Sequence, residues 1–226
     1  HIADSESSDH DVFRKKFSRF DTSRKAYWKR VELPIDLIGE VKKYVESKGK
    51  RFLCSAFSLK AVEDLLQLDI ERIKIGSADV TNGIMLQRIA DANIPTIISN
   101  GLRDQAALSR AIDLLSAGND DITIFHCTTQ YPTLLSEVNF QEIDHIKDSY
   151  PNCAVGLSDH TGSIWPVIYA AAANIDVCEV HVAFARNDFG PDTSSSILVS
   201  ELPVINEAIA AFREISKPQS ADLANS

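Results

Sequence analysis

The stretch Val155-Gly156-Leu157-Ser158-Asp159-His160-Thr161-Gly162 is where the sequence shows its fold class most clearly. Small apolar residues run directly into four polar ones, and a glycine stands on either side. This pattern is typical of a buried strand that ends in a polar turn, with a helix beginning at Gly162. In α/β proteins the side chains at the carboxyl ends of parallel strands form the mouth of the sheet, where ligands bind. The stretch therefore predicts that Ser158, Asp159 and His160 lie at such a mouth.

The same arrangement recurs one strand–helix unit later. Residues 177–181 form another short apolar run that ends in a histidine, His181. Two histidines at the ends of consecutive parallel strands can point into one crevice, so His160 and His181 are candidate ligands of one metal ion. The alternative is that each histidine is a hydrogen-bonded residue on the rim of the sheet.

Strand and helix patterns alternate along most of the chain. The predicted strands cover 51–57, 72–78, 95–100, 122–128, 153–158 and 177–182. The predicted helices cover 34–48, 59–68, 83–92, 104–117, 140–149, 163–173 and 201–215. Strands that each precede a helix form right-handed βαβ units and a parallel sheet. No G-x-G-x-x-G follows the first strand, which argues against a dinucleotide-binding fold.

The number of strands predicts an incomplete barrel. A complete (β/α)8 TIM barrel has eight strands in about 250 residues. Six strands and a leading helix fit an α/β barrel that lacks its first strand, first helix and second strand. The chain begins at His1 and its one methionine is Met85, so we expect residues upstream of this sequence. We expect residues 1–216 to form the partial barrel and residues 217–226 a polar tail or linker.

Composition limits the partners that we expect. The 226 residues carry a formal net charge of -9, which argues against a broad nucleic-acid-binding face. No apolar run approaches the roughly 18 residues of a membrane span, and the first residues do not resemble a signal peptide. The 4 cysteines form no C-x-x-C and lie in predicted strands. Buried, reduced thiols of a cytoplasmic protein are the expected state.

Lys74 indicates a site for an anion. It lies inside an apolar strand, where a charge is costly unless it meets an opposite charge. Gly76 should share its face and Ser77 follows closely, so an ammonium, a hydroxyl and exposed amides would surround a phosphate or carboxylate. The alternative is a lysine that extends to solvent or pairs with an acid.

Five motifs, taken in order, resemble the sialic acid synthase family. They are K-I-G-S-A-D at 74–79, H-C-T-T-Q-Y-P-T at 126–133, G-L-S-D-H-T at 156–161, E-V-H at 179–181 and F-G-P-D at 189–192. The family comprises the N-acetylneuraminate synthases and their legionaminic and pseudaminic relatives. The resemblance extends from Ser55 to Asp192.

The resemblance implies an activity and a set of roles. The family condenses phosphoenolpyruvate with N-acetylmannosamine or a related amino sugar, releasing phosphate and a nonulosonic acid, and needs a divalent metal, manganese or else magnesium or cobalt. The full-length form is expected to be a homodimer. The implied metal ligands are His160 and His181; the implied phosphoenolpyruvate residues are Ser55, Lys74, Ser77, Thr129 and Ser158; the implied sugar residues are Tyr131 and Asp192. Asp79 and Lys74 are the candidate catalytic residues, because Asp79 stands where the family has a glutamate near the reacting centre.

Several departures from the family pattern keep alternatives open. Asp79 is one methylene shorter than the expected glutamate, and Asn100 and Leu102 replace Thr and Met of S-T-G-M. The family's upstream glutamate and lysine would precede His1, and its C-terminal antifreeze-like domain is not in this sequence. The alternatives are a non-catalytic sugar- or anion-binding barrel, or another phosphoenolpyruvate-dependent aldol-type synthase, such as the 3-deoxy-octulosonate phosphate type.

Three further features of the sequence carry expectations. Open strand edges beside 51–57 and 177–182 would make this segment alone poorly soluble or self-associating, and inactive. Asp159 either orients His160 or caps the next helix. Arg186 contacts either substrate or solvent, and the sequence does not decide between them.

Overall fold

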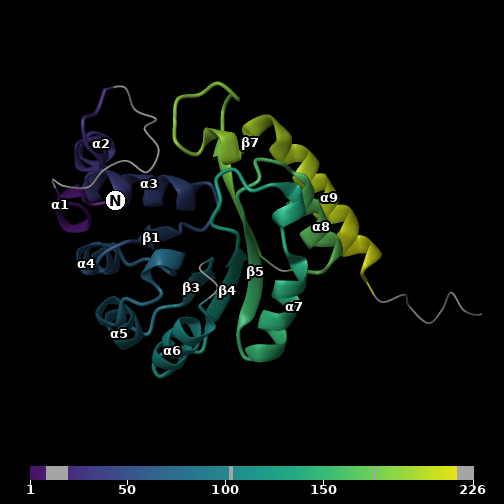
Figure 1. The fold of residues 1–226 in the computed structure, drawn as a ribbon, viewed down its shortest axis with the longest axis horizontal. Helices are drawn as coiled ribbons and strands as arrows, with labels where there is room; N and C mark the ends of the chain where they lie inside the picture. Colours follow the sequence, from purple (N-terminus) through teal and green to yellow (C-terminus); the bar gives the residue numbers. More distant parts are fainter. Residues whose placement is uncertain (9–19, 102–103, 176, 218–226) are drawn as a thin grey trace, which may run out of the picture. The chain divides into compact units, whose positions relative to one another are not determined.

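The structure is a computed structural model, and it describes residues 1–8, 20–101, 104–175 and 177–217 (Figure 1). The predicted tail at 217–226 therefore lies, apart from Lys217, outside the described residues. The chain divides into two compact units. Unit 1 is His1–Phe125 with Lys147–Ala154, and unit 2 is His126–Ile146 with Val155–Ser226.

The described strands follow the chain order β1-β2-β3-β4-β5-β6-β7 in one sheet, and helices alternate with them. The strands are β1 Cys54–Ala56, β2 Ile73–Ile75, β3 Thr96–Asn100, β4 Ile122–Cys127, β5 Ala154–Asp159, β6 Cys178–Ala183 and β7 Ser196–Leu198. The α-helices are α1 Ala3–Glu6, α2 Arg24–Val31, α3 Ile35–Ser47, α4 Leu59–Gln67, α5 Gly83–Asp91, α6 Gln105–Ser116, α7 Phe140–Ser149, α8 Trp165–Ala172 and α9 Leu202–Ile215. Sequential parallel strands with intervening helices confirm the predicted fold class, an incomplete (β/α)8 barrel.

Unit 1 contains β1, β2 and β3, together with most of β4. Cys54 pairs with Ile73 between β1 and β2, and Ile73 pairs with Thr96 between β2 and β3. Polar side chains begin the helices that follow: Ser58 accepts from the backbone N–H of Ala61, and equivalent caps precede α5 and α6. Such caps satisfy N–H groups that have no partner within the helix.

The core of unit 1 comes from apolar side chains on strands and helices alike. Its fully buried members include Ile73, Ile75, Ile89, Ile98 and Leu108. Strands that are apolar on both faces need helical cover, which α4, α5 and α6 supply with their own buried residues.

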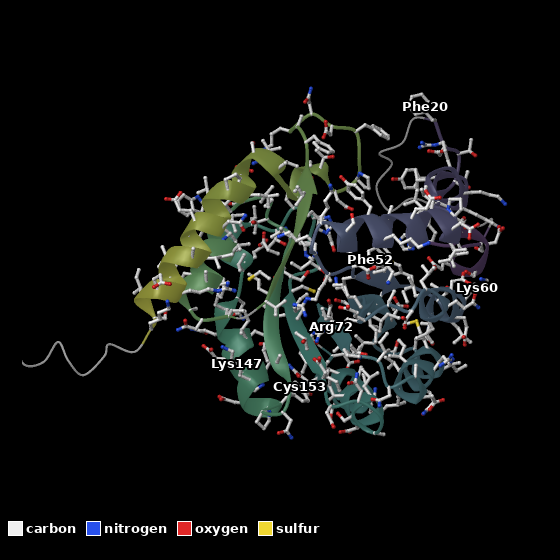
Figure 2. The ribbon with its side chains drawn as sticks, turned by 180° about the vertical axis from the view of Figure 1, so that it is seen from behind. Phe20, Phe52, Lys60, Arg72, Lys147 and Cys153 are labelled. Carbon is white, nitrogen blue, oxygen red and sulfur yellow. The ribbon has the colours of Figure 1, made fainter. Side chains whose placement is uncertain are left out.

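Unit 1 also has an open apolar region near its N-terminal helices. Helix α3 buries no residue, although its apolar positions recur at helical spacing. A hollow of about 530 Å³ lies between α3, α4 and the segment before β1. Phe52 and Lys60, which Figure 2 labels, belong to its wall. The hollow is lined mainly by apolar side chains, among them Leu33 and Val41, which are 54% and 41% exposed.

Unit 2 is built on β5, β6 and β7. Ser158 of β5 pairs with Glu179 of β6, and His181 pairs with Ser196 of β7. Both pairings are parallel. The core that supports these strands consists of Val167, Ile197 and Ile205, with apolar residues of α8, α9 and β6 packed against it. The carboxyl ends of β5 and β6 are thereby held side by side, and they carry the candidate site.

Strand β7 was not predicted from the sequence. It is three residues long and follows a run of hydroxyl residues, which the sequence pattern marks as a turn. Its pairing with His181–Ala183 means that the expected open edge beside 177–182 was wrong for the second half of β6. The expected edge beside 51–57 stays a prediction. Among the described residues, no helix is both long and apolar enough to span a bilayer.

Candidate functional site

The structure brings the imidazole rings of His160 and His181 together in unit 2. His160 directly follows β5 and is 5% exposed, and His181 lies within β6 and is half-buried. The ring centroids are 5.3 Å apart, with the planes inclined at 66°. Neither side chain points to the opposite face of the sheet, so the two rings can serve one ligand.

Hydrogen bonds define the tautomer of His160. Its Nδ1–H donates to the backbone carbonyl oxygen of Thr128 at 3.0 Å. Because a carbonyl oxygen can only accept, the proton of the neutral ring lies on Nδ1. Nε2 then accepts from the phenol O–H of Tyr131, also at 3.0 Å. The backbone is held as well, because Thr133 N–H donates to the carbonyl oxygen of His160.

Tyr131 packs against both histidines. Its ring centroid lies 4.3 Å from that of His160 and 5.9 Å from that of His181. Burial raises the pKa of Tyr131 to about 12, and nearby acidic groups contribute less. The phenol therefore keeps its proton at neutral pH and remains a hydrogen-bond donor within the site.

Asp192 stands next to His181. The Oδ2 of Asp192 is 3.8 Å from the Nδ1 of His181, and the carboxylate side chain is 48% exposed. This distance is too long for a hydrogen bond, so Asp192 lies beside the ring without fixing its orientation. Half of it also faces solvent, so it can accept a hydrogen bond from a ligand.

These residues fit a divalent metal ion that completes its coordination with water or substrate. A carbonyl oxygen holds the Nδ1–H of His160, which is the usual support for a metal-binding imidazole. Its Nε2 accepts from Tyr131 in this structure, so that bond must open before Nε2 can bind an ion. Within the part of the chain that the structure describes, no group of three or more His, Cys, Asp or Glu side chains is placed to hold an ion. Two histidines are one protein ligand fewer than most catalytic zinc sites have, so water or substrate would have to fill the remaining positions.

The predicted anion residues of unit 1 lie at neighbouring strand ends. Ser55 of β1 and Lys74 of β2 are register partners, and Lys74 is half-buried. The hydroxyl of Ser77, just after β2, accepts from the backbone N–H of Gly101 at 2.9 Å. Ser55, Lys74 and Ser77 thus belong to one local region. Their predicted convergence with Thr129 and Ser158, which belong to unit 2, stays a prediction.

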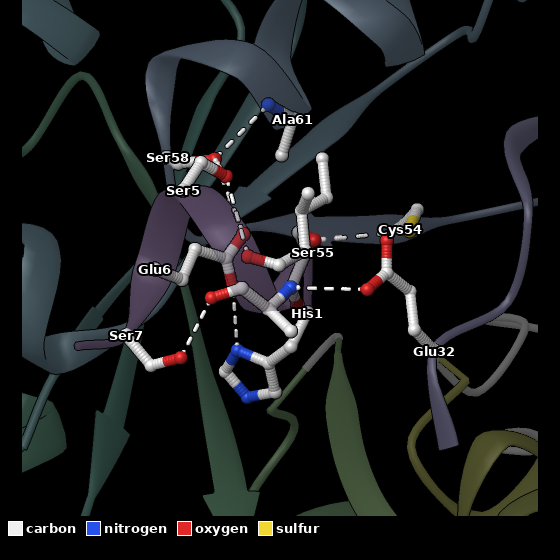
Figure 3. Close-up of polar contacts among 11 residues, drawn as sticks. His1, Ser5, Glu6, Ser7, Glu32, Cys54, Ser55, Ser58 and Ala61 are labelled. Atoms are coloured by element: carbon white, nitrogen blue, oxygen red, sulfur yellow. Dashed lines mark hydrogen bonds and ion pairs between the residues drawn. The ribbon is translucent and has the colours of Figure 1, made fainter. Parts of the chain in front are cut away.

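Asp79 has an altered acidity. It ends a short 3-10 turn after β2 and is half-buried. Burial, followed by the negative charge of Glu6, raises the pKa of Asp79 to about 6. Glu6 is held by His1 Nδ1 at 2.6 Å and by the hydroxyl of Ser58 at 3.1 Å (Figure 3). A carboxyl group with a pKa near neutrality is suited to proton transfer.

The comparison with known protein families decides the relationship. Residues 2–219 match the model of the NeuB family. The chain belongs to the NeuB family. This membership confirms the resemblance to the sialic acid synthases that the motifs indicated.

Curated relatives of this NeuB-family chain include named synthases. The N,N'-diacetyllegionaminic acid synthase of Campylobacter jejuni is 31% identical over 208 residues, covering 91% of this chain and 61% of that protein. The N-acetylneuraminate-9-phosphate synthase of Drosophila melanogaster is 29% identical over 168 residues, covering 74% of this chain and 45% of that protein. The chain therefore spans about three fifths or less of the length of these relatives.

A solved structure supports the fold. The N-acetylneuraminic acid (sialic acid) synthetase of Leptospira borgpetersenii superposes with a TM-score of 0.81 at 23% identity. The match covers 91% of this chain and 74% of that chain. At this identity the likeness shows the fold of the NeuB-family chain and not its activity.

Glu179 is a polar residue of the site that the sequence reasoning missed. It accepts a hydrogen bond from the hydroxyl of Ser158, 2.8 Å away, across the pairing of β5 and β6. Glu179 shares one face of β6 with His181, because strand residues two apart point the same way. A carboxylate two residues before the histidine in an apolar strand was the available signal. Ser158 therefore has a partner within the protein.

Asp159 closes the turn that leads into α8. Its Oδ2 accepts from the backbone N–H of Thr161 at 3.1 Å and from the hydroxyl of Thr161 at 2.8 Å. That hydroxyl in turn accepts from the N–H of Ser163. Burial raises the pKa of Asp159. These bonds hold the segment that follows His160, but they do not cap α8, whose N-cap is Ile164 without a side-chain hydrogen bond. The expected capping role was therefore wrong.

Proposed function

We propose that the protein carrying this chain condenses phosphoenolpyruvate with N-acetylmannosamine or a related amino sugar, giving a nonulosonic acid and phosphate. The proposal is supported by membership of the NeuB family and by relatives named as synthases of such acids. The observation that carries it is the meeting of His160, His181 and Tyr131 at the ends of β5 and β6.

The reaction forms one carbon–carbon bond and breaks one bond to phosphate. The methylene carbon of phosphoenolpyruvate bonds to the aldehyde carbon of the open-chain sugar, and the aldehyde oxygen takes up a proton. Positive charge then develops on the carbon that bears the phosphate, and the oxygen of a water molecule adds there. Loss of inorganic phosphate leaves the 2-keto acid.

His160 and His181 would hold a divalent ion, manganese or else magnesium or cobalt, which would polarise the aldehyde as a Lewis acid. Thr128 would keep Nε2 of His160 unprotonated through its bond to Nδ1. Tyr131 would donate its phenol proton in a hydrogen bond to the sugar, and Asp192 would accept from a sugar hydroxyl. Such contacts orient the aldehyde before the bond forms.

Lys74, with Ser55, Ser77, Thr129 and Ser158, would bind phosphoenolpyruvate. The half-buried ammonium of Lys74 would neutralise part of the phosphate and carboxylate charge, and the hydroxyls of Ser55, Ser77 and Thr129 would donate hydrogen bonds. Ser158 would have to turn its hydroxyl away from Glu179 before it could donate to the ligand. Asp79 would accept the proton of the attacking water, because its carboxylate form predominates above its pKa of about 6. Homodimer formation by the full-length protein is part of the proposal.

A phosphate-release assay with manganese, phosphoenolpyruvate and N-acetylmannosamine tests the proposal. We expect sugar-dependent release and a product with the mass of the nonulosonic acid. Release with arabinose 5-phosphate instead would support the octulosonate type of synthase. Saturable binding of both substrates without release would support the non-catalytic barrel. Either result would contradict the proposed activity.

A further inference from the structure

We propose that Arg186 is a positioning residue that fixes the His160 turn against the segment carrying Asp192. Arg186 lies in the loop after β6, outside the residues assigned above to metal or substrate. Its guanidinium contacts three separate parts of unit 2. Nη1 donates to the carbonyl oxygens of Gly162 at 3.1 Å and Ser196 at 2.7 Å, and Nη2 donates to Glu201 at 2.8 Å.

The first contact reaches the turn that holds His160. Gly162 lies two residues after His160 and has a φ of +68°, in the left-handed region. A Cβ at Gly162 would come within 2.7 Å of the carbonyl oxygen of Ser194. The turn therefore packs directly on the backbone of residues 194–196, and this close approach requires glycine.

The second contact reaches the segment that holds Asp192. Ser196 begins β7 and is the register partner of His181. The hydroxyl of Ser196 donates to the carbonyl oxygen of Asp192 at 2.8 Å. One nitrogen of Arg186 thus joins the backbone after His160 to the backbone that supports Asp192 and borders His181.

The loop that carries Arg186 is itself fixed. The Oδ2 of Asp188 accepts from the backbone N–H groups of Phe184 and Ala185 at 3.0 and 2.9 Å. A planar guanidinium presented from a closed turn can donate to several acceptors in a set geometry, which a lysine ammonium does less well. The exposed ion pair with Glu201 should matter less than the two carbonyl contacts, because exposed ion pairs contribute little.

The first test needs no metal and no substrate. Side-chain ¹⁵N spectra of His160 and His181 are compared in wild type and in Arg186→Met, Arg186→Lys and Arg213→Met, the last removing a guanidinium from the final turn of α9 as a control. We expect the ring signals to shift in Arg186→Met, to shift less in Arg186→Lys, and to match wild type in Arg213→Met. Identical ring spectra in wild type and Arg186→Met would overturn the inference.

The second test is kinetic and rests on the proposed function. We expect Arg186→Met to lower kcat/KM for the sugar by about ten- to a hundredfold, as small misplacements of reacting groups do, while the KM for phosphoenolpyruvate stays within about twofold of wild type. Glu201→Gln should change kcat/KM by less than about threefold, since its amide oxygen still accepts a hydrogen bond. An equal rise in both KM values would show a structural role only.

The two tests separate the inference from the activity. A wild type that makes no product, together with histidine signals that respond to Arg186→Met, would refute the proposed function and support the positioning role. Should Arg186→Met fail to fold, Arg186→Lys decides. The ring spectra and the sugar kinetics of Arg186→Lys must then lie between those of wild type and those of a folded Arg186→Gln variant. Wild-type values for Arg186→Lys would overturn the inference.

Discussion

In unit 2 the imidazole of His160 has a hydrogen-bond partner at each nitrogen, whereas in unit 1 the carboxyl group of Asp79 is affected by the negative charge of another acid, Glu6. The first arrangement stabilises one tautomer of the ring. The second raises the pKa of Asp79. At neutral pH the carboxyl group is mostly ionised, and keeping that charge in the folded state lowers the free energy of unfolding. Groups with altered acidity of this kind concentrate at functional sites.

The comparison extends to packing. In unit 2 the buried core of Val167, Ile197 and Ile205 packs against Cys178 and Val180 of β6, and β6 pairs with β5. In unit 1, helix α3 buries none of its side chains and borders a hollow of about 530 Å³. We infer that the histidine site depends mainly on contacts within its own unit. Ser55, Lys74 and Ser77 instead belong to a unit with an open apolar face.

The largest expected effect is loss of the histidine pair. Removing a residue that supports a metal ligand lowers affinity or activity by about ten- to a hundredfold. His160→Ala or His181→Ala removes a ligand itself, so manganese affinity and turnover should each fall by more than about a hundredfold. Calorimetry with manganese measures the first effect and phosphate release the second. His145→Ala is the matched control, because His145 is an exposed histidine of α7. Wild-type manganese binding by both variants would place the ion elsewhere.

Lys74→Ala should give the next largest effect. Removing one partner of a desolvated charge pair costs about 2–5 kcal/mol, so phosphoenolpyruvate binding should weaken by that amount. Equilibrium binding of phosphoenolpyruvate measures it. Lys43→Ala, on the exposed side of α3, should bind like wild type. Unchanged affinity in Lys74→Ala would leave Lys74 with a structural role.

Asp79→Asn should stabilise the fold while lowering activity. The folded pKa of Asp79, about 6, lies above its ordinary value of 3.8, so folding favours the protonated form. Its contribution to stability is fully present below pH 3.8 and is lost as the pH rises through 6. The asparagine should therefore raise the free energy of unfolding by about 1 kcal/mol at pH 8, since partial exposure reduces the full effect.

Urea unfolding at several pH values tests that expectation. The gain in Asp79→Asn should grow between pH 4 and 6 and remain constant above pH 6. Asp120→Asn, an exposed acid of unit 1, is the control. A gain that is independent of pH would show that charge at Asp79 is not its cause.

The smallest expected effect is that of Ser158→Ala. It removes the 2.8 Å hydrogen bond to Glu179 and leaves a carboxylate oxygen without that donor. We expect about 1 kcal/mol of lost stability, typical of one intramolecular hydrogen bond. Thermal unfolding measures the loss, and the double variant with Glu179→Gln should lose less than the sum of the single changes.

Much of the fold could be predicted from the sequence because local patterns carry the information. Apolar runs at strand length and helical spacing gave six strands and the helices between them. Strand β7 could not be predicted, since a three-residue strand is defined by its pairing with β6 and not by its own pattern. Strand β1 is also shorter than expected, Cys54–Ala56 within 51–57, because hydrogen-bonded pairing sets its limits.

The candidate site also has a part that could be predicted from the sequence and a part that could not. His160 could be predicted because its strand-end position is visible in the sequence. His181 was also expected at a strand end, but it lies within β6, which continues to Ala183 where it pairs with β7. The partners that define their chemistry could not, since Thr128 acts through its backbone carbonyl and Tyr131 reaches His160 from the preceding loop. Arg186 acts on backbone atoms of Gly162 and Ser196, which no residue pattern reveals.

One measurement tests the central claim most directly, namely that His160 and His181 hold a divalent ion in a NeuB-family synthase. Crystals of the protein carrying this chain, grown with manganese, are measured for anomalous scattering at the manganese absorption edge. We predict one strong peak within roughly 2.0–2.3 Å of a ring nitrogen of each histidine, Nε2 in the case of His160. An anomalous peak elsewhere, with Tyr131 still bonded to Nε2 of His160, would contradict the account.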